Sequence, residues 1–357
     1  MRAFRFPRRL TATVIDGLRS RRAGGTAIPV LALPGAAGSG ATCLSVFLAA
    51  ALAACAPTRQ EGSFPSVEVT AVDAGPGLDS AAFDGSGQTL TALDGTWVLL
   101  EVNSTCVHVL ASAVENFAYA WNLVNVTQIG SSVDGRTRWI RVTSKPCFKD
   151  LTPIIMDLAA NVPSSMLQKI PPSQFVCTVT LSDKADPDAE PVDLTGASLA
   201  CEPELVTWGL ALDDPWNDPV PTDKDDPHVI DQDEDGNPGV TLILGDDVCD
   251  MYLVQRTVCL YEGTFTSQAR LKGTFQADLQ QKVLDGTQPL CLSENETTDN
   301  LPRNRLYLMR VDGFAGPVDA DVDGNGQVTC SEVEASRSAL EQEYEVEQLA
   351  PDSAQCK

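Results

Sequence analysis

Two short acidic segments contain the residue types that could hold a divalent cation. The first segment, 321–332, reads DVDGNGQVTCSE and places oxygen-bearing side chains at alternate positions from Asp321 onward. Calcium takes about six to eight oxygen ligands, which a short turn of carboxylates and amides can supply. The segment therefore predicts a calcium site. A zinc site is not expected, because the cysteines of the chain form no CxxC pair.

This segment matches the pattern D-x-[DN]-x-[DN]-G-x5-E at every specified place and resembles the calcium loop of EF-hand proteins of the calmodulin type. The resemblance implies oxygen ligands at six positions: the side chains of Asp321, Asp323 and Asn325, the backbone carbonyl of Gln327, Thr329 directly or through water, and both carboxylate oxygens of Glu332. Two glycines and a proline at 311–320 leave no clear entering helix. The segment is thus more similar to dockerin-like or single EF loops than to a paired sensor.

The second segment contains Asp231, Asp233 and Asp235 followed by Gly236, which is the first half of a calcium loop. The EF-hand pattern then fails, because Leu242 stands where the closing glutamate is needed. Either it binds calcium with ligands from elsewhere, such as Asp246 or Asp247, or it is a solvated acidic loop. The run DQDEDGNPGVT, followed by YLVQRTVCLYEGTF, also resembles uncharacterised envelope proteins of myxobacteria-like bacteria, a resemblance that implies no activity.

The N-terminal region has the features of an export signal. Residues 1–22 carry seven arginines and one acid, and an apolar run follows at Ala41–Ala54. The run ends in Leu52-Ala53-Ala54-Cys55, which resembles the lipobox of bacterial lipoproteins. That resemblance implies cleavage before Cys55, a lipid on Cys55, and attachment to a membrane of the bacterial cell envelope, in the outer membrane or facing the periplasm. The alternatives are an ordinary secretory cleavage nearby, or a twin-arginine signal.

The excess of acidic residues limits the classes of molecule that the protein is expected to bind. The chain has 25 Lys and Arg against 49 Asp and Glu. Removal of residues 1–54 takes away seven arginines and one acid, so the remaining chain has a net charge of about −30. Such an excess of acids argues against nucleic acid as a partner, because phosphate binding needs a basic surface. No P-loop, GxGxxG, HExxH or GxSxG pattern is present.

The chain has 11 cysteines, and most of them should pair in an exported protein. Cys43 leaves with the signal, so nine remain if Cys55 carries lipid and ten if it does not. The connectivity cannot be deduced from the sequence. Proximity along the chain weakly favours three pairs: Cys106–Cys147, Cys177–Cys201 and Cys330–Cys356.

Period-2 alternation dominates between Thr96 and Val311 and predicts a mainly β domain, an antiparallel sandwich or barrel with minor helices. Strands are expected at Thr96–Val102, Arg138–Thr143, Phe175–Ser182, Leu205–Leu212, Val240–Leu244, Met251–Tyr261, Leu271–Leu279 and Leu306–Val311. Helical patches are expected at Ala111–Trp121 and Leu151–Ile170, and a helix at Ser331–Leu349. Gly95-Thr96-Trp97 is similar to the GxW of lipocalins, although a core position is the expected role of Trp97.

These patterns divide the chain into a signal peptide (1–54), a lipid-anchored flexible tether (55–95), a β-rich domain (96–311) and an EF-hand-like loop and helix (312–357). They favour a calcium-binding envelope lipoprotein that uses calcium structurally and acts as a binding or structural module. A protein or glycan partner fits that function. The alternatives are a secreted hydrolase with a carboxylate site and a calcium-dependent adhesion or sensor protein. A non-enzymatic function is favoured over an enzymatic one.

Overall fold

The computed structural model describes residues 92–109, 112–152, 160–245, 248–292, 297–344 and 356. The predicted signal peptide, Cys55 and nearly all of the predicted tether lie outside these residues, as do Asp246 and Asp247. Among the helices of the described residues, none is long and apolar enough to cross a membrane.

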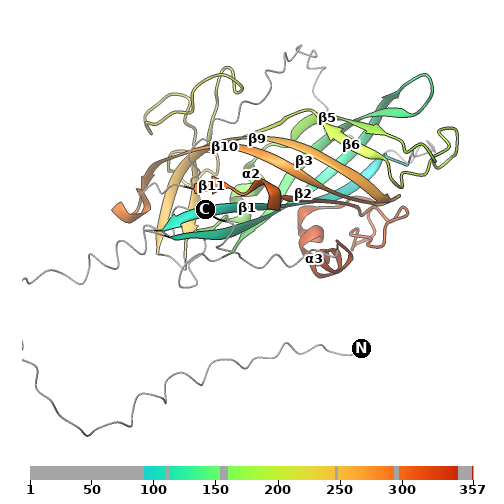
Figure 1. Cartoon of the computed structure of the whole chain (residues 1–357). Coiled ribbons are helices and arrows are strands. Elements are labelled where there is room, and N and C mark those ends of the chain that lie inside the picture. The colour runs from blue at the N-terminus through green and yellow to red at the C-terminus, as the bar shows by residue number, and fades with distance from the viewer. Residues whose placement is uncertain are drawn as a thin grey trace, which may run out of the picture. The chain divides into compact units, whose positions relative to one another are not determined.

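Eight antiparallel strands form a sheet that closes on itself (Figure 1). In spatial order these strands are β10 (Arg270–Gly286), β12 (Arg305–Arg310), β1 (Gly95–Val109), β2 (Ser112–Ser131), β3 (Thr137–Leu151), β5 (Ser173–Thr180), β6 (Ser198–Cys201) and β9 (Cys249–Ser267). Strand β9 pairs with β10 and completes the ring. Of the two architectures expected from the sequence, the structure is therefore the barrel.

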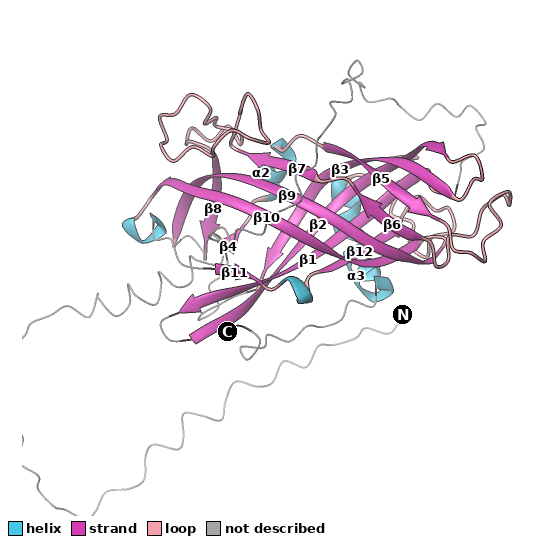
Figure 2. Cartoon of the chain, turned by 45° about the horizontal axis from the view of Figure 1, so that its top comes forward, coloured by secondary structure: helices cyan, strands magenta, loops and turns pink. Residues whose placement is uncertain are grey.

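Shorter elements extend this ring at its sides (Figure 2). Strands β7 and β8 pair with β9, β4 pairs with β8, and β11 pairs with β1. The described elements outside the ring are β4 (Ala160–Asn161), α2 (Ser164–Lys169), β7 (Glu204–Trp208), β8 (Val240–Leu244), η3 (Pro289–Leu292), β11 (Thr297–Asp299), η4 (Leu301–Arg303) and α3 (Cys330–Tyr344).

Both faces of β1 are buried at the end where α3 lies. Trp97 and Leu99 face the barrel interior, whereas Val98 and Leu100 face outward against α3. This double burial explains the nearly continuous apolar run of β1, because a strand covered on both sides shows little polar alternation. The helix predicted at Ser331–Leu349 is confirmed as far as Tyr344, and residues 345–349 lie outside the described residues. Its periodic apolar residues Val333, Leu340 and Tyr344 belong to the outer cluster.

Trp97 is buried in the interior cluster, which confirms its expected core position. The Arg310 guanidinium is fully buried and lies 5.8 Å from the Trp97 ring centre. Arg310 also forms a two-point ion pair with Asp312 (2.8 and 3.0 Å) and donates to the Ala92 carbonyl. Gly95 has φ +147°, and a Cβ there would collide with Asp312. The glycine, the tryptophan and the arginine are therefore parts of one packed unit.

Two of the three expected cysteine pairs are wrong. The structure has Cys177–Cys201, as expected, but it pairs Cys106 with Cys356 and Cys147 with Cys330. Proximity in sequence failed because the C-terminal segment returns to the outside of β1 and β3. These disulfides are typical of proteins outside the cytoplasm.

The helical expectation at Ala111–Trp121 is also wrong, because residues from Ser112 onward form the long strand β2. Its outward side chains, Phe117 and Trp121, are covered by the cluster under α3, and tertiary packing overrides the helix-forming alanines. The expected helix Leu151–Ile170 is wrong over most of its described residues: Leu151 ends strand β3, Ala160 and Asn161 form β4, and only the six residues of α2 are helical.

Candidate metal sites

The segment 321–332 is a tight loop organised by the Asp321 carboxylate. That carboxylate accepts hydrogen bonds from the backbone N–H groups of Asn325 (3.0 Å) and Gly326 (2.8 Å). Asp323 accepts from the same Asn325 N–H (3.1 Å), and the Asn325 side-chain oxygen accepts from the Gln327 N–H (2.8 Å). The backbone donors thus turn three side-chain oxygens toward the centre of the loop.

Glycine is needed in this loop because of backbone conformation. Gly324 and Gly326 have φ of +71° and +82°, in the left-handed region that other residues rarely adopt. A Cβ at either position would meet no atom within 4 Å. A substitution there therefore strains the backbone without causing a collision.

The loop ends where α3 begins, in a reciprocal pair of hydrogen bonds between Thr329 and Glu332. The Glu332 carboxylate accepts from the Thr329 N–H (2.9 Å), and the Thr329 hydroxyl oxygen lies 3.4 Å from the Glu332 N–H. This is a capping box. Glu332 also accepts from the Val322 N–H (3.1 Å) at the opposite end of the loop. These bonds, those from Thr329 first, lower the pKa of Glu332 and keep the carboxylate charged.

The structure brings Asp321, Asp323 and Glu332 together, with one oxygen of each within 4.8 Å of the others. Asn325 lies beside them and donates from its side-chain nitrogen to Asp323 (2.9 Å). The Thr329 hydroxyl contacts Glu332 at 2.8 Å. Carboxylate oxygens have several lone pairs, so these hydrogen bonds leave acceptor positions open. The donor set is made of hard oxygens and fits calcium. Gln327 is placed by its N–H bond to Asn325.

No helix enters this loop, as the sequence indicates. Residues 311–329 consist of turns and an isolated bridge between Asp312 and Asp319, and the helix follows only at Cys330. In place of an entering helix, the disulfide Cys147–Cys330 attaches the exit of the loop to β3.

The loop that begins at Asp231 repeats this geometry position by position. The Asp231 carboxylate accepts from the N–H groups of Asp235 (3.1 Å) and Gly236 (2.9 Å), and Asp235 accepts from the Asn237 N–H (2.8 Å). Each bond has its counterpart at the same offset from Asp321. The left-handed positions also correspond: Glu234 (φ +62°) and Gly236 (φ +89°) match the two glycines of the first loop.

The two loops differ in how they close. Leu242 stands at the place of the closing glutamate. It is buried in an apolar cluster that includes Met166 and Leu167 of α2, called here the cluster around α2. Thr241 stands beside it and donates from its N–H to Asp233 (2.8 Å) and from its hydroxyl to Asp235. Thr241 is not among the ligands expected from the sequence, although a hydroxyl residue one place before Leu242 could have indicated it.

An unsatisfied oxygen marks this second loop. Asp231, Asp233 and Asp235 form a second group of converging carboxylates. The Asp233 Oδ1 atom is buried and has no hydrogen-bond partner among the described residues. Burial, and less strongly the nearby Asp235 and Asp231 carboxylates, raise the pKa of Asp233. A buried carboxylate oxygen without a donor fits a cation that occupies its free side.

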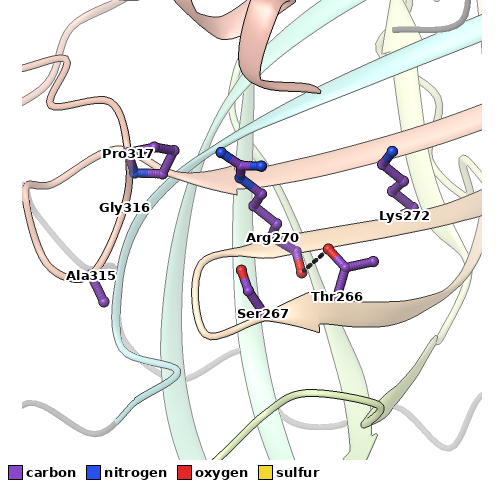
Figure 3. A pocket seen from close by; sticks show the side chains of 7 residues that line it. All are labelled: Thr266, Ser267, Arg270, Lys272, Ala315, Gly316 and Pro317. Carbon is purple, nitrogen blue, oxygen red and sulfur yellow. Dashed lines mark hydrogen bonds between the residues drawn. The ribbon is translucent and has the colours of Figure 1, made fainter. Parts of the chain in front are cut away.

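A wide hollow of about 550 Å³ lies elsewhere, beside the turn between β9 and β10 (Figure 3). It is lined by Thr266, Ser267, Arg270, Lys272, Ala315, Gly316 and Pro317. Arg270 forms an ion pair with Glu343 of α3. None of the predicted ligands lines this hollow, so it is separate from both acidic loops.

No protein-family model matches the chain, and no curated protein or solved structure matches it.

Proposed function

We propose that the protein is a calcium-binding protein of the bacterial cell envelope in which calcium has a structural role. The observation that supports this function best is the hydrogen-bonded arrangement shared by the loops at Asp321 and Asp231. In each loop, backbone N–H groups hold converging carboxylates in a turn with two left-handed positions. The first loop would bind calcium through Asp321, Asp323, Asn325, Gln327, Thr329 and Glu332.

The packing of α3 favours a structural role over a sensor role. A calcium sensor exposes an apolar groove when its helices move apart. Here the apolar side of α3 is already buried against the barrel through Val333, Leu340 and Tyr344, and the Tyr344 hydroxyl donates to the Val98 carbonyl (2.5 Å). Calcium at Glu332 would hold the start of a helix that is docked along its length.

The second loop would be a weaker site, with Asp231, Asp233 and Asp235 as ligands. It lacks a closing glutamate, so water would complete the coordination. Both loops have three carboxylates, but the second lacks a closing carboxylate that binds through both oxygens and has fewer protein ligands, which predicts a lower calcium affinity than in the first loop.

The same proposal places the chain outside the cytoplasm. The LAAC segment supports cleavage before Cys55 and a lipid on Cys55, which would be the contact with the membrane. The disulfides support an oxidising compartment. The barrel would act as a binding or structural module toward a protein or glycan, and the acidic chain would not bind nucleic acid. Mass spectrometry of the protein from its native membrane tests the anchor, because a diacylated or triacylated Cys55 is expected, whereas an unmodified N-terminus elsewhere would contradict it.

Thermal unfolding in calcium and in a chelator tests the calcium function. A ligand at about 100 times its Kd stabilises the folded state by about 2.7 kcal/mol. That stabilisation corresponds to a rise of roughly 5–10 °C for a domain of this size. Glu332→Gln should lose most of the rise, whereas Glu334→Gln, which changes an exposed glutamate two residues later, should keep it. An equal melting temperature in calcium and in chelator would contradict the proposal.

A further inference from the structure

A small cavity of about 100 Å³ lies on the inner face of the barrel. It separates the interior cluster from the cluster around α2. Strand β9 runs past both clusters: its residue Tyr261 belongs to the interior cluster, and its residue Leu253 belongs to the cluster around α2. Between them, Thr257 and Gln255 line the cavity. A chamber lined by both polar and apolar side chains thus lies between two apolar regions.

Two carboxylates, Glu101 of β1 and Glu204 of β7, meet in this chamber at one hydroxyl group. The Tyr261 hydroxyl lies 2.8 Å from Glu101 Oε1 and also contacts Glu204 Oε2. Asn122 donates to Glu101 (3.2 Å), and the Ser173 hydroxyl donates to Glu204. The tyrosine has one hydrogen and can donate to only one carboxylate. The second contact therefore requires a proton on one of the two carboxyl groups.

The charges around this pair show what could replace that proton. Lys149 of β3 lines the same cavity, so two carboxylates that share one proton are balanced by one ammonium group. The remaining titratable neighbours, Cys259 and Tyr261, are neutral, because burial raises the pKa of each well above its usual value. Exchange of the shared proton for a monocation leaves the net charge of the cavity unchanged. A dication or an anion would leave an uncompensated charge in a buried site.

Burial first, and then the neighbouring Glu204 carboxylate, raise the pKa of Glu101 to about 7 against the opposing effects of Tyr261 and Lys149. The pKa of Glu204 is also raised by burial. The shared proton is therefore lost near neutral pH, which is where a cation can displace it at little cost.

An independent observation also indicates a ligand. Trp208 lines the cavity with 6% of its surface exposed, and its indole Nε1 is buried with no hydrogen-bond partner among the described residues. A buried donor of this kind calls for an acceptor in the cavity. Phe148 and Leu167 line the same cavity and add apolar surface.

We propose that this cavity binds a small organic cation, a primary ammonium group on a short chain that ends in an oxygen acceptor. The ammonium group would displace the proton shared by Glu101 and Glu204, and the oxygen would accept from the Trp208 indole. The volume admits only a few non-hydrogen atoms, well below a ligand of drug size. This site is distinct from both acidic loops and does not depend on calcium.

Calorimetric titration of the full-length protein with 3-aminopropan-1-ol tests the proposal. In two buffers of different ionisation enthalpy near pH 7, binding should release a proton. Below pH 7 the affinity should fall about tenfold for each unit by which the pH is lowered, because the cation competes with that proton. Propane-1,3-diol, of the same length without charge, should not bind. Equal binding of the diol, an affinity independent of pH, or no binding of the amine at millimolar concentration would overturn the proposal.

Variants locate the binding on these residues. Glu204→Gln should weaken binding about tenfold or more, because it removes a charged partner of the ammonium group. Glu262→Gln changes the glutamate of β9, which follows Tyr261 and is exposed, and should bind as the unchanged protein does. If Glu204→Gln does not fold, Glu101→Gln carries the same expectation. Unchanged affinity in a folded variant of either glutamate would overturn the assignment. Butylammonium should bind less tightly than the amino alcohol, and equal affinity would remove the role assigned to Trp208.

Discussion

Cys330, the first residue of α3, is disulfide-bonded to Cys147 of β3. The closing glutamate of the loop follows two residues later, so this bond attaches the end of the loop to the wall of the barrel. A ligand that orders the loop therefore stabilises a segment that is covalently linked to the main sheet.

Replacement of both cysteines, Cys147→Ala with Cys330→Ala, should lower the stability of the protein and its calcium affinity together. The bond closes a stretch of 183 residues, and loss of a native disulfide typically costs about 2–5 kcal/mol. Urea unfolding measures the first effect and calcium titration the second. The matched control removes Cys177–Cys201, which joins β5 to β6 and has no covalent link to the loop. It should lower stability and leave calcium affinity unchanged, and a loss of affinity in the control would contradict the local role of Cys147–Cys330.

Gly326→Ala should weaken calcium binding at the first loop by about 1–2 kcal/mol, which is the cost of a left-handed conformation for a residue with a Cβ. Space is not limiting there, so the effect is conformational. Gly236→Ala should have the corresponding effect on the second loop alone. Calcium titration of the two variants would distinguish the two sites. If both variants bound calcium as the unchanged protein does, the left-handed turns would not be needed for binding.

Arg310→Lys should destabilise the barrel by about 2–3 kcal/mol, because lysine keeps the charge but loses the two-point pair with Asp312 and the stacking on Trp97. Arg305→Lys, at the other end of β12, is the control, since Arg305 is partly exposed and bonds only to nearby carbonyls in the described structure. Chemical denaturation of both variants measures the difference. Equal stability of the two would contradict the role given to Arg310.

The contribution of Glu101 to the stability of the protein should decrease as pH rises from its ordinary pKa of 4.5 to about 7. Glu101 has a folded pKa of about 7 against an ordinary value of 4.5, because burial and Glu204 oppose its charge. A raised carboxyl pKa gives full stability below the ordinary value and loses it as pH rises through the folded one. Glu101→Gln should flatten this dependence between pH 5 and pH 8, by roughly 1–3 kcal/mol. Urea unfolding at the two pH values measures it, and an unchanged slope in the variant would contradict the assignment to Glu101.

Features set by neighbours in sequence could be predicted. The spacing of Asp321, Asp323 and Glu332 indicated a loop that the structure does fold around those residues, and the apolar period of α3 indicated its buried side. The alternation of Phe175, Cys177 and Val179 likewise predicted a strand with one buried face, as β5 shows. Each of these depends on local backbone geometry.

Features set by residues far apart in sequence could not be predicted. Cys106 pairs with Cys356 across 250 residues, and that choice depends on where the chain returns to the barrel. Glu101 and Glu204 were not selected because the chain is rich in acids and nothing local distinguishes an inward one. Only closure of the sheet brings β1, β7 and β9 around Tyr261.

Calcium titration by calorimetry, comparing the unchanged protein with Glu332→Gln and Glu334→Gln, tests the central claim most directly. We expect saturable calcium binding in the unchanged protein, with the tighter phase lost in Glu332→Gln and retained in Glu334→Gln. The remaining weaker phase should belong to the loop at Asp231. Absence of calcium binding in the unchanged protein, or a tight phase that survives in Glu332→Gln, would contradict the account.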